Sequence, residues 1–145
     1  MTTSSEYATA GWGETPRECP ALPKAFVATR EGAKVTLWPE LDLAERYRKA
    51  QVFFDAQDYR TAEDLLVEVV TAEPAHQASR LLLARTYYHT AQLRRAEEHL
   101  RVIIEREPTE AYAHLMLGRT LQRSGRHAEA VPHLRMAAIM MGEGA

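Results

Sequence analysis

Histidines are the side chains in this sequence best suited to hold a metal ion, and the 145 residues contain six of them. Two histidines four residues apart share one helical face, which is a common arrangement of metal ligands. Most of these histidines lie on different predicted helices or at other spacings: His89, His99, His114, His127 and His133. We therefore expect no metal site and no cofactor.

Motifs for catalysis do not stand out either. The sequence has no glycine-rich phosphate loop, no nucleophile elbow and no acid and base pair at a catalytic spacing. Cys19 precedes Pro20, which could be interpreted as a reactive thiol or a haem-binding dipeptide, but nothing nearby would lower its pKa, so we expect it to be incidental. The protein is predicted not to be an enzyme, and an enzyme or metal carrier built on the histidines is the alternative.

Composition and charge place the chain among ordinary globular proteins. Apolar residues make up 46 % and the net charge is −2, which suits one domain and lacks the basic surplus typical of nucleic-acid binding. A single cysteine excludes an intramolecular disulfide and favours a reducing compartment. No apolar run approaches the roughly 18 residues of a membrane helix, and the polar start is unlike a signal peptide. We expect a cytoplasmic protein with no membrane or nucleic-acid partner.

The N-terminal segment, residues 1–42, differs in character from the rest. Residues 1–20 are rich in Ser, Thr, Gly and Pro and are expected to form a disordered tail. Residues 21–42 contain more apolar side chains, but prolines and a glycine interrupt them, so an extended, irregular segment is expected. The sequence leaves open whether this segment packs on the remainder of the chain or occupies its binding face.

From Leu43 onward the sequence repeats itself with a period of about 34 residues. Small, aromatic, aliphatic and proline residues return at this spacing in six columns. The columns are Ala50, Ala84 and Gly118; Phe53, Tyr87 and Leu121; Ala62, Ala96 and Ala130; Leu66, Leu100 and Leu134; Val69, Ile103 and Ala137; and Pro74 with Pro108. Six columns in one register indicate three copies of one structural unit.

Each copy reads as a helix, a tight turn and a second helix, because two stretches of helical periodicity flank a short break. The expected helices span residues 43–56, 59–72, 77–90, 93–106, 111–124 and 127–141. Small residues at the repeated alanine columns would let helix axes approach within about 8–10 Å. The predicted fold is all-α, a right-handed α-solenoid of three helix-turn-helix repeats with an irregular N-terminal extension.

This pattern resembles the tetratricopeptide repeat family, whose signature is a small-aromatic spacing on one helix, an alanine on the next and a closing proline. The resemblance covers residues 43–142, divided as 43–76, 77–110 and 111–142. The chain departs from the family pattern at a few positions. Arg46, Arg80 and His114 stand where tryptophan is frequent, Lys49 replaces a leucine, and Gly142 stands at the third proline position.

The resemblance implies a non-catalytic adaptor that binds a peptide or protein segment in a concave groove lined by the first helices. The predicted groove residues are Tyr47, Gln51, Phe54, Leu81, Arg85, Tyr88, His89, Tyr112, Leu115, Arg119, Gln122 and Arg123. Tyrosine and arginine are enriched at binding hot spots, so a partner with acidic and apolar side chains is expected. The clamp that many family members use for chaperone C-termini is not evident, because Tyr47, Gln51, Leu82, Tyr112 and Met116 stand at its positions.

The C-terminal helix offers an alternative function. Its last turns are apolar and no polar capping helix follows, although such a helix usually closes a solenoid. Weak self-association through Met136, Ile139 and Met140, giving a homodimer or a structural subunit, is therefore the second hypothesis.

Overall fold

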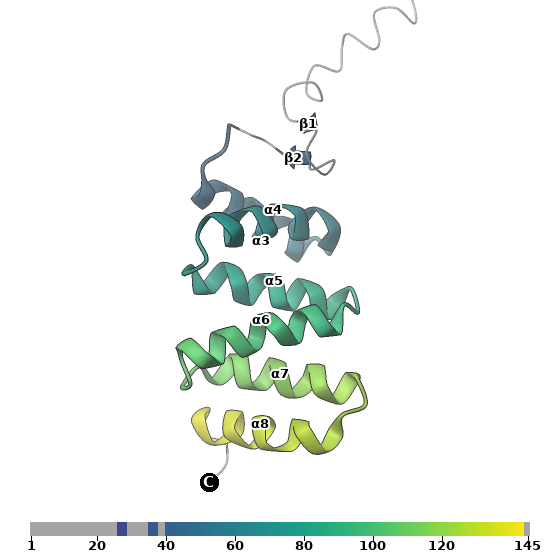
Figure 1. Cartoon of the computed structure of the whole chain (residues 1–145), viewed down its shortest axis with the longest axis vertical. Coiled ribbons are helices and arrows are strands. Elements are labelled where there is room, and N and C mark those ends of the chain that lie inside the picture. Colours follow the sequence, from purple (N-terminus) through teal and green to yellow (C-terminus); the bar gives the residue numbers. More distant parts are fainter. Residues whose placement is uncertain (1–25, 29–34, 38–39, 144–145) are drawn as a thin grey trace, which may run out of the picture. The chain divides into compact units, whose positions relative to one another are not determined.

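The computed structural model describes residues 26–28, 35–37 and 40–143 (Figure 1). The predicted disordered tail, 1–20, and Cys19 lie outside these residues. By its internal contacts the chain divides into Met1–Asp42 and Leu43–Ala145.

Two short strands form in the N-terminal part. Strand β1, Phe26–Ala28, pairs antiparallel with β2, Val35–Leu37, and Phe26 lies opposite Leu37. Sequence analysis predicted an extended segment here but not the pairing. Aromatic and β-branched residues favour strands, which fits the composition of both. This hairpin is the one described departure from an all-α chain.

The C-terminal part consists of six helices stacked one after another in a column (Figure 1). They are α3 (Leu43–Asp55), α4 (Tyr59–Ala72), α5 (Gln77–His89), α6 (Leu93–Arg106), α7 (Ala111–Arg123) and α8 (His127–Met140). Each helix packs against the next along the chain. All six helices were predicted, and their ends differ from the prediction by no more than a single position, so the α-solenoid architecture is confirmed.

The turns within the three repeats share one backbone geometry. Gln57, Ala91 and Gly125 occupy equivalent positions in successive repeats and have positive φ angles of 65°, 64° and 84°. In each turn the following N–H reaches back to a carbonyl in the last turn of the first helix, as in Asp58 N to Phe53 O at 2.8 Å. This is the hydrogen bond of a Schellman helix end, which requires a left-handed residue.

Small residues lie where the helices approach most closely. Ala50, Ala62, Ala84, Ala96 and Ala130 are fully buried, as the repeat pattern predicts. At the equivalent position on α7 an added Cβ on Gly118 would lie 2.5 Å from Cγ and Cδ2 of Leu134. Leucine, isoleucine and methionine fill the spaces between these crossings, with Leu100, Ile103, Met116, Leu117 and Leu121 in one core cluster. The second and third repeats therefore share one core cluster.

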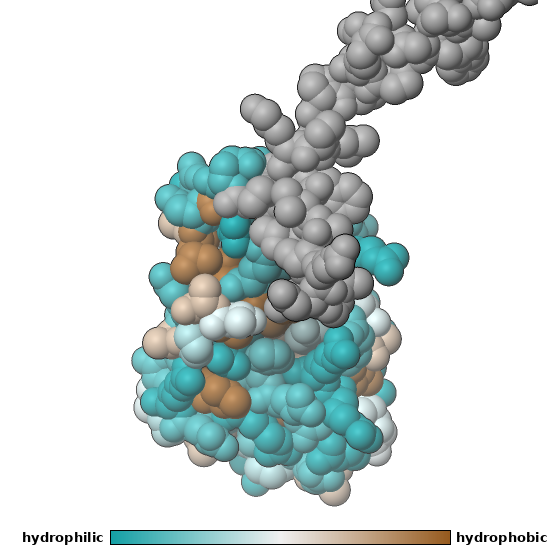
Figure 2. Space-filling view, turned by 45° about the horizontal axis from the view of Figure 1, so that its top comes forward, coloured by the Kyte–Doolittle hydropathy of each residue, from teal (hydrophilic) through white to brown (hydrophobic). Residues whose placement is uncertain are grey.

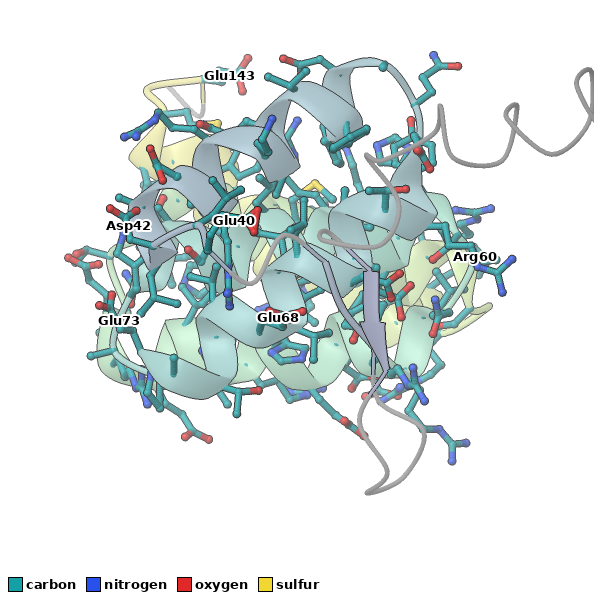
Figure 3. All side chains as sticks on the ribbon, turned by 90° about the horizontal axis from the view of Figure 1, so that it is seen from above. Glu40, Asp42, Arg60, Glu68, Glu73 and Glu143 are labelled. Atoms are coloured by element: carbon teal, nitrogen blue, oxygen red, sulfur yellow. The ribbon has the colours of Figure 1, made fainter. Side chains whose placement is uncertain are left out.

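The helices cross the full width of the column, which gives it two long edges. Figure 3, seen down the column, shows Arg60 at the start of α4 and Glu73 just after its end at opposite sides of the molecule. We call the side with the turns inside each repeat, residues 56–58, 90–92 and 124–126, the turn edge. The links between repeats, residues 73–76 and 107–110, form the opposite edge.

Candidate binding face

The twelve predicted groove residues all lie on the first helices of the repeats, α3, α5 and α7. We call the surface that they form the first-helix face. Their environments differ: Phe54 is buried, Arg85 and the three tyrosines are half-buried, and Arg119, Gln122 and Arg123 are exposed. The contacts among them divide the face into a tightly connected part and an open part.

Arg85 connects all three first helices. Its guanidinium carbon lies 4.7 Å from the ring centre of Phe54 on α3 and 5.7 Å from that of Tyr112 on α7. A guanidinium within about 6 Å of a ring centre is attracted to the π electrons, and this planar group also stacks well on aromatic faces. Arg85 is thus held by two rings.

Arg123 is held in a similar way by the preceding repeat. Its guanidinium carbon lies 5.0 Å from the ring centre of Tyr88, and Nη1 donates a hydrogen bond to the Tyr88 carbonyl. Tyr88 itself packs against the core cluster. The tyrosine predicted as an anchor for a partner therefore also supports an arginine of the same chain.

His89 lies between these two arginines and a group of rings. Its imidazole stacks on Tyr59 from α4, with ring centres 4.8 Å apart and planes nearly parallel, and meets the edge of Phe54 at 5.5 Å. Partial burial is the main cause that lowers the His89 pKa, and the charges of Arg85 and then Arg123 lower it further. The neutral imidazole is therefore favoured. We call Phe54, Tyr59, Arg85, Tyr88, His89, Tyr112 and Arg123 the cation–aromatic cluster.

The remaining predicted residues lie outside this cluster. Gln51 donates a hydrogen bond to the Tyr47 hydroxyl at 3.4 Å, and Tyr47 meets the ring of His76 edge to face. Leu81 is half-buried against the core cluster, and Leu115 is half-buried as well. Arg119 and Gln122 are exposed on α7. The structure thus brings together six of the twelve predicted residues in this cluster and leaves the other six outside it.

The arginines of this face lack carboxylate partners. Within residues 40–143, Arg85, Arg119 and Arg123 form no ion pair with Asp or Glu. The second helices and turns differ, because Arg101 and Arg126 both pair with Glu97, at 2.8 Å and 2.7 Å. Acidic residues therefore pair with some arginines of the second helices and turns, whereas none of the described residues pairs with these three arginines of the first-helix face.

The turn edge carries a polar ladder that sequence analysis missed. Glu63 on α4 accepts a hydrogen bond from Gln92 at 3.0 Å, and Glu97 on α6 accepts one from Arg126 at 2.7 Å. The two carboxylates stand at equivalent positions of successive repeats, so the recurrence of Glu in this column was the available signal. In the third repeat Val131 stands at the equivalent position, so the ladder ends there.

Two surface hollows lie along this edge. One of about 650 Å³ is lined by residues 91–95, Glu97, Ser124 and Arg126, and a second of about 430 Å³ by Arg60, Glu63, Asp64, Thr90 and Gln92. The first-helix residues that were predicted to bind a partner line neither hollow.

Polar side chains lie between the two helices of each repeat, at the position where the family pattern frequently has tryptophan. Arg46 pairs with Glu68 at 2.7 Å in the first repeat. Arg80 Nη1 lies 3.1 Å from His99 Nδ1 in the second. In the third, His114 Nδ1 lies 3.3 Å from His133 Nδ1. Arg80 and His114 also bond the carbonyls of Pro74 and Pro108, so these departures from the family pattern tie the two helices to the loop before them.

Histidines meet across helices in this arrangement, which spacing along one helix could not predict. His114 and His133 form one such pair, and residues 40–143 contain no group of three or more His, Cys, Asp or Glu placed to hold a metal ion. None of the helices in the described ranges is long and apolar enough to span a bilayer.

These histidines predict a stability that depends on pH. Burial, and next the charge of Arg80, lowers the pKa of His99, while burial and then His114 lower that of His133. Both return to about 6.5 on unfolding, so the unfolded chain binds more protons and stability falls as the pH drops through about 6.5. Urea unfolding is expected to give a lower midpoint at about pH 5.5 than at about pH 7.5.

The control for this prediction is His127, which is exposed at the start of α8. His99→Gln with His133→Gln is expected to weaken the pH dependence, whereas His127→Gln should retain it. A midpoint in the wild-type protein that stays constant across this range would show that neither histidine has a depressed pKa.

The fold defines the class of protein as a stack of helix-turn-helix repeats. Proteins of this class present an extended surface on which partners can bind. Comparison with known proteins identifies the repeats. A family model described as tetratricopeptide repeat matches residues 53–118, which confirms the presence of this repeat in the chain. None of the curated proteins matches the sequence.

Solved structures of MamA are similar to this chain. MamA 41-end from Desulfovibrio magneticus RS-1 has a TM-score of 0.67 and 26 % identity over 71 % of this chain. MamA AMB-1 has a TM-score of 0.67 and 24 % identity over 72 % of this chain. The present chain covers 58 % and 61 % of those two chains, about three fifths of their length. This likeness, together with the repeat match, supports a protein-interaction scaffold.

Proposed function

We propose that this protein is a non-catalytic adaptor that binds a peptide or protein segment with acidic and apolar side chains on its first-helix face. Residues 43–142 are the binding domain in this proposal, and the single cysteine suits a cytoplasmic location. The observation that carries the proposal is the charge on that face. Arg85, Arg119 and Arg123 have no carboxylate partner among the described residues, whereas Glu97 pairs with both Arg101 and Arg126.

Apolar surface accompanies these charges. Leu81, Tyr88, Tyr112 and Leu115 are half-buried and expose part of their side chains on the same helices. A partner that complements both features would gain affinity from apolar contact and orientation from the arginines. Figure 2 shows that hydrophilic residues cover most of the visible surface and that hydrophobic residues form small separate groups.

Selection of displayed random peptides on the immobilised full chain tests this proposal. The wild-type protein is expected to enrich peptides that combine Asp or Glu with apolar residues. Arg119→Glu with Arg123→Glu should abolish the acidic preference. Arg94→Glu with Arg135→Glu is the matched control, because it makes the same charge change at exposed positions of α6 and α8. Failure to enrich any peptide, or equal loss in both variants, would refute the proposed function.

The apolar end of the column favours a second function, self-association. Exposed fractions are 49 % for Val131, 43 % for Met136, 59 % for Ile139 and 41 % for Met141. Met140 is half-buried, so the exposed patch differs in part from the predicted set. Glu63 and Glu97 each accept a hydrogen bond from the repeat that follows, and Val131 stands at the equivalent position of the third repeat. In a head-to-tail stack of copies, Val131 could not accept such a bond, so the polar ladder would not continue into a second copy.

Sedimentation velocity at increasing protein concentration checks this second function. Self-association through α8 predicts a rising sedimentation coefficient that Ile139→Glu suppresses. Ala78→Glu is the control, since Ala78 is exposed on α5, between the two ends of the stack. A wild-type protein that remains monomeric at high concentration would remove this function from consideration.

A further inference from the structure

We propose that the cation–aromatic cluster is a carboxylate site of the first-helix face, at which binding of an acidic side chain is coupled to protonation of His89. This inference rests on the proposed function and specifies the part of the face that receives the acidic group. It assigns the rings of Phe54, Tyr88 and Tyr112 to the support of arginines, in addition to any contact with a partner.

The arginines of the cluster have N–H donors that no acceptor among the described residues occupies. The Arg85 guanidinium lies against two rings, at 4.7 Å and 5.7 Å, and no hydrogen bond joins Arg85 to an acceptor within residues 40–143. Arg123 has one hydrogen bond, to the Tyr88 carbonyl. A guanidinium carries five N–H donors in its plane, and a carboxylate can accept two of them side by side. The rings thus orient donors that remain available.

Positive charge surrounds His89. Its neighbours are the ring of Phe54 from α3, Tyr59 from α4, Arg85 and the ring of Tyr88 on its own helix, and Arg123 from α7. Two of these neighbours are cations, and neither forms an ion pair with a carboxylate of the described chain. Protonation of His89 therefore adds a third positive charge beside Arg85 and Arg123, whose charges no carboxylate of the described residues neutralises. A carboxylate from a partner would remove that repulsion.

Protonation of His89 and binding of a carboxylate should favour each other. Opposite charge within about 4–6 Å raises a histidine pKa, so a carboxylate bound beside Arg85 and Arg123 would raise the depressed pKa of His89. Thermodynamic linkage makes the effect reciprocal: the protonated protein must bind the carboxylate more tightly by the same factor. A rise of about one pKa unit corresponds to about tenfold tighter binding.

The test uses glutarate, a small dicarboxylate, as the probe and the full chain as the protein. The ring protons of His89 are followed by NMR from about pH 7.5 to about pH 5, a range that brackets the ordinary histidine pKa, with glutarate or with sodium chloride at equal ionic strength. We expect glutarate to raise the His89 pKa by up to about one unit. The exposed His127 is the internal control, and glutarate should leave its ring signals unchanged at each pH.

Variants separate this site from general charge effects. Arg123→Gln changes an exposed residue and leaves Arg85 against its rings, so the fold should persist, and it is expected to reduce the glutarate effect on His89. Arg94→Gln on α6 should leave that effect unchanged. An unchanged His89 pKa in glutarate, or an equal response in Arg123→Gln, would overturn this inference. Because peptide selection tests the face independently, such a result would leave the proposed function standing.

Discussion

Replacing Gly118 by valine is expected to lower the free energy of unfolding by about 3 kcal/mol, the upper part of the range for overpacked cores. The new Cβ would lie 2.5 Å from Cγ and Cδ2 of Leu134 and 3.3 Å from its backbone nitrogen. Leu134 cannot simply swing away, because its Cγ and main chain are both near, so α7 and α8 must separate. For a domain of this size the midpoint of thermal unfolding should fall by about 4–8 °C per kcal/mol.

A double-mutant cycle isolates the cause of this effect. Leu134→Ala removes the atoms that Gly118→Val would strike, so the double variant is expected to be more stable than the sum of the single changes predicts. Gly125→Ala is the comparison, because nothing lies within 4 Å of its added Cβ and only its φ angle of 84° resists the change, at a cost of about 1–2 kcal/mol. Wild-type stability in Gly118→Val would contradict the close approach of these helices.

The close crossing of α7 and α8 could be predicted from the sequence, because a small residue recurs at the same position of each repeat. Ala50, Ala84 and Gly118 are small at one spacing, and tight packing between helices requires small residues there. The turns were predicted for the same reason, since the break in periodicity recurs at residues 57, 91 and 125, although only the third is glycine. A left-handed Gln57 and Ala91 show that packing on both sides of a turn can impose a conformation that the residue itself disfavours.

The contacts of the candidate site were not predictable in the same way. Sequence analysis placed Arg85, Tyr88 and Arg123 on one face but treated each as free for a partner. Their pairing depends on how adjacent repeats are offset, since Phe54 reaches Arg85 of the next repeat, and Tyr88 likewise reaches Arg123. Tyr59 was missed because it belongs to a second helix and contacts His89 only in the folded structure.

Arg119→Glu together with Arg123→Glu is expected to slow association of an acidic peptide by about tenfold or more, the lower end of electrostatic steering. Both residues are exposed on α7, so the change reverses the local charge with little effect on the core. Surface plasmon resonance with a selected acidic peptide measures the rate. At about 1 M salt the Debye length falls to about 3 Å, and most of the difference between variant and wild type should disappear.

Tyr88→Ala should affect the same peptide differently. Loss of the ring removes apolar area and also the support under Arg123, so affinity is expected to fall by about 1–2 kcal/mol, mainly through faster dissociation. Tyr88→Phe keeps the ring and is the matched control. Equal association rates in the wild type and the double arginine variant at low salt would contradict the role given to the arginines.

The most direct test of a binding site on the first-helix face is an NMR map of amide chemical shifts as a selected acidic peptide is added to the full chain. If the first-helix face binds the peptide, the largest changes are expected on α3, α5 and α7, around Arg85, His89, Arg119 and Arg123, with smaller changes on α4, α6 and α8. Largest changes on the second helices or along the turn edge would contradict it and place the binding site on another surface.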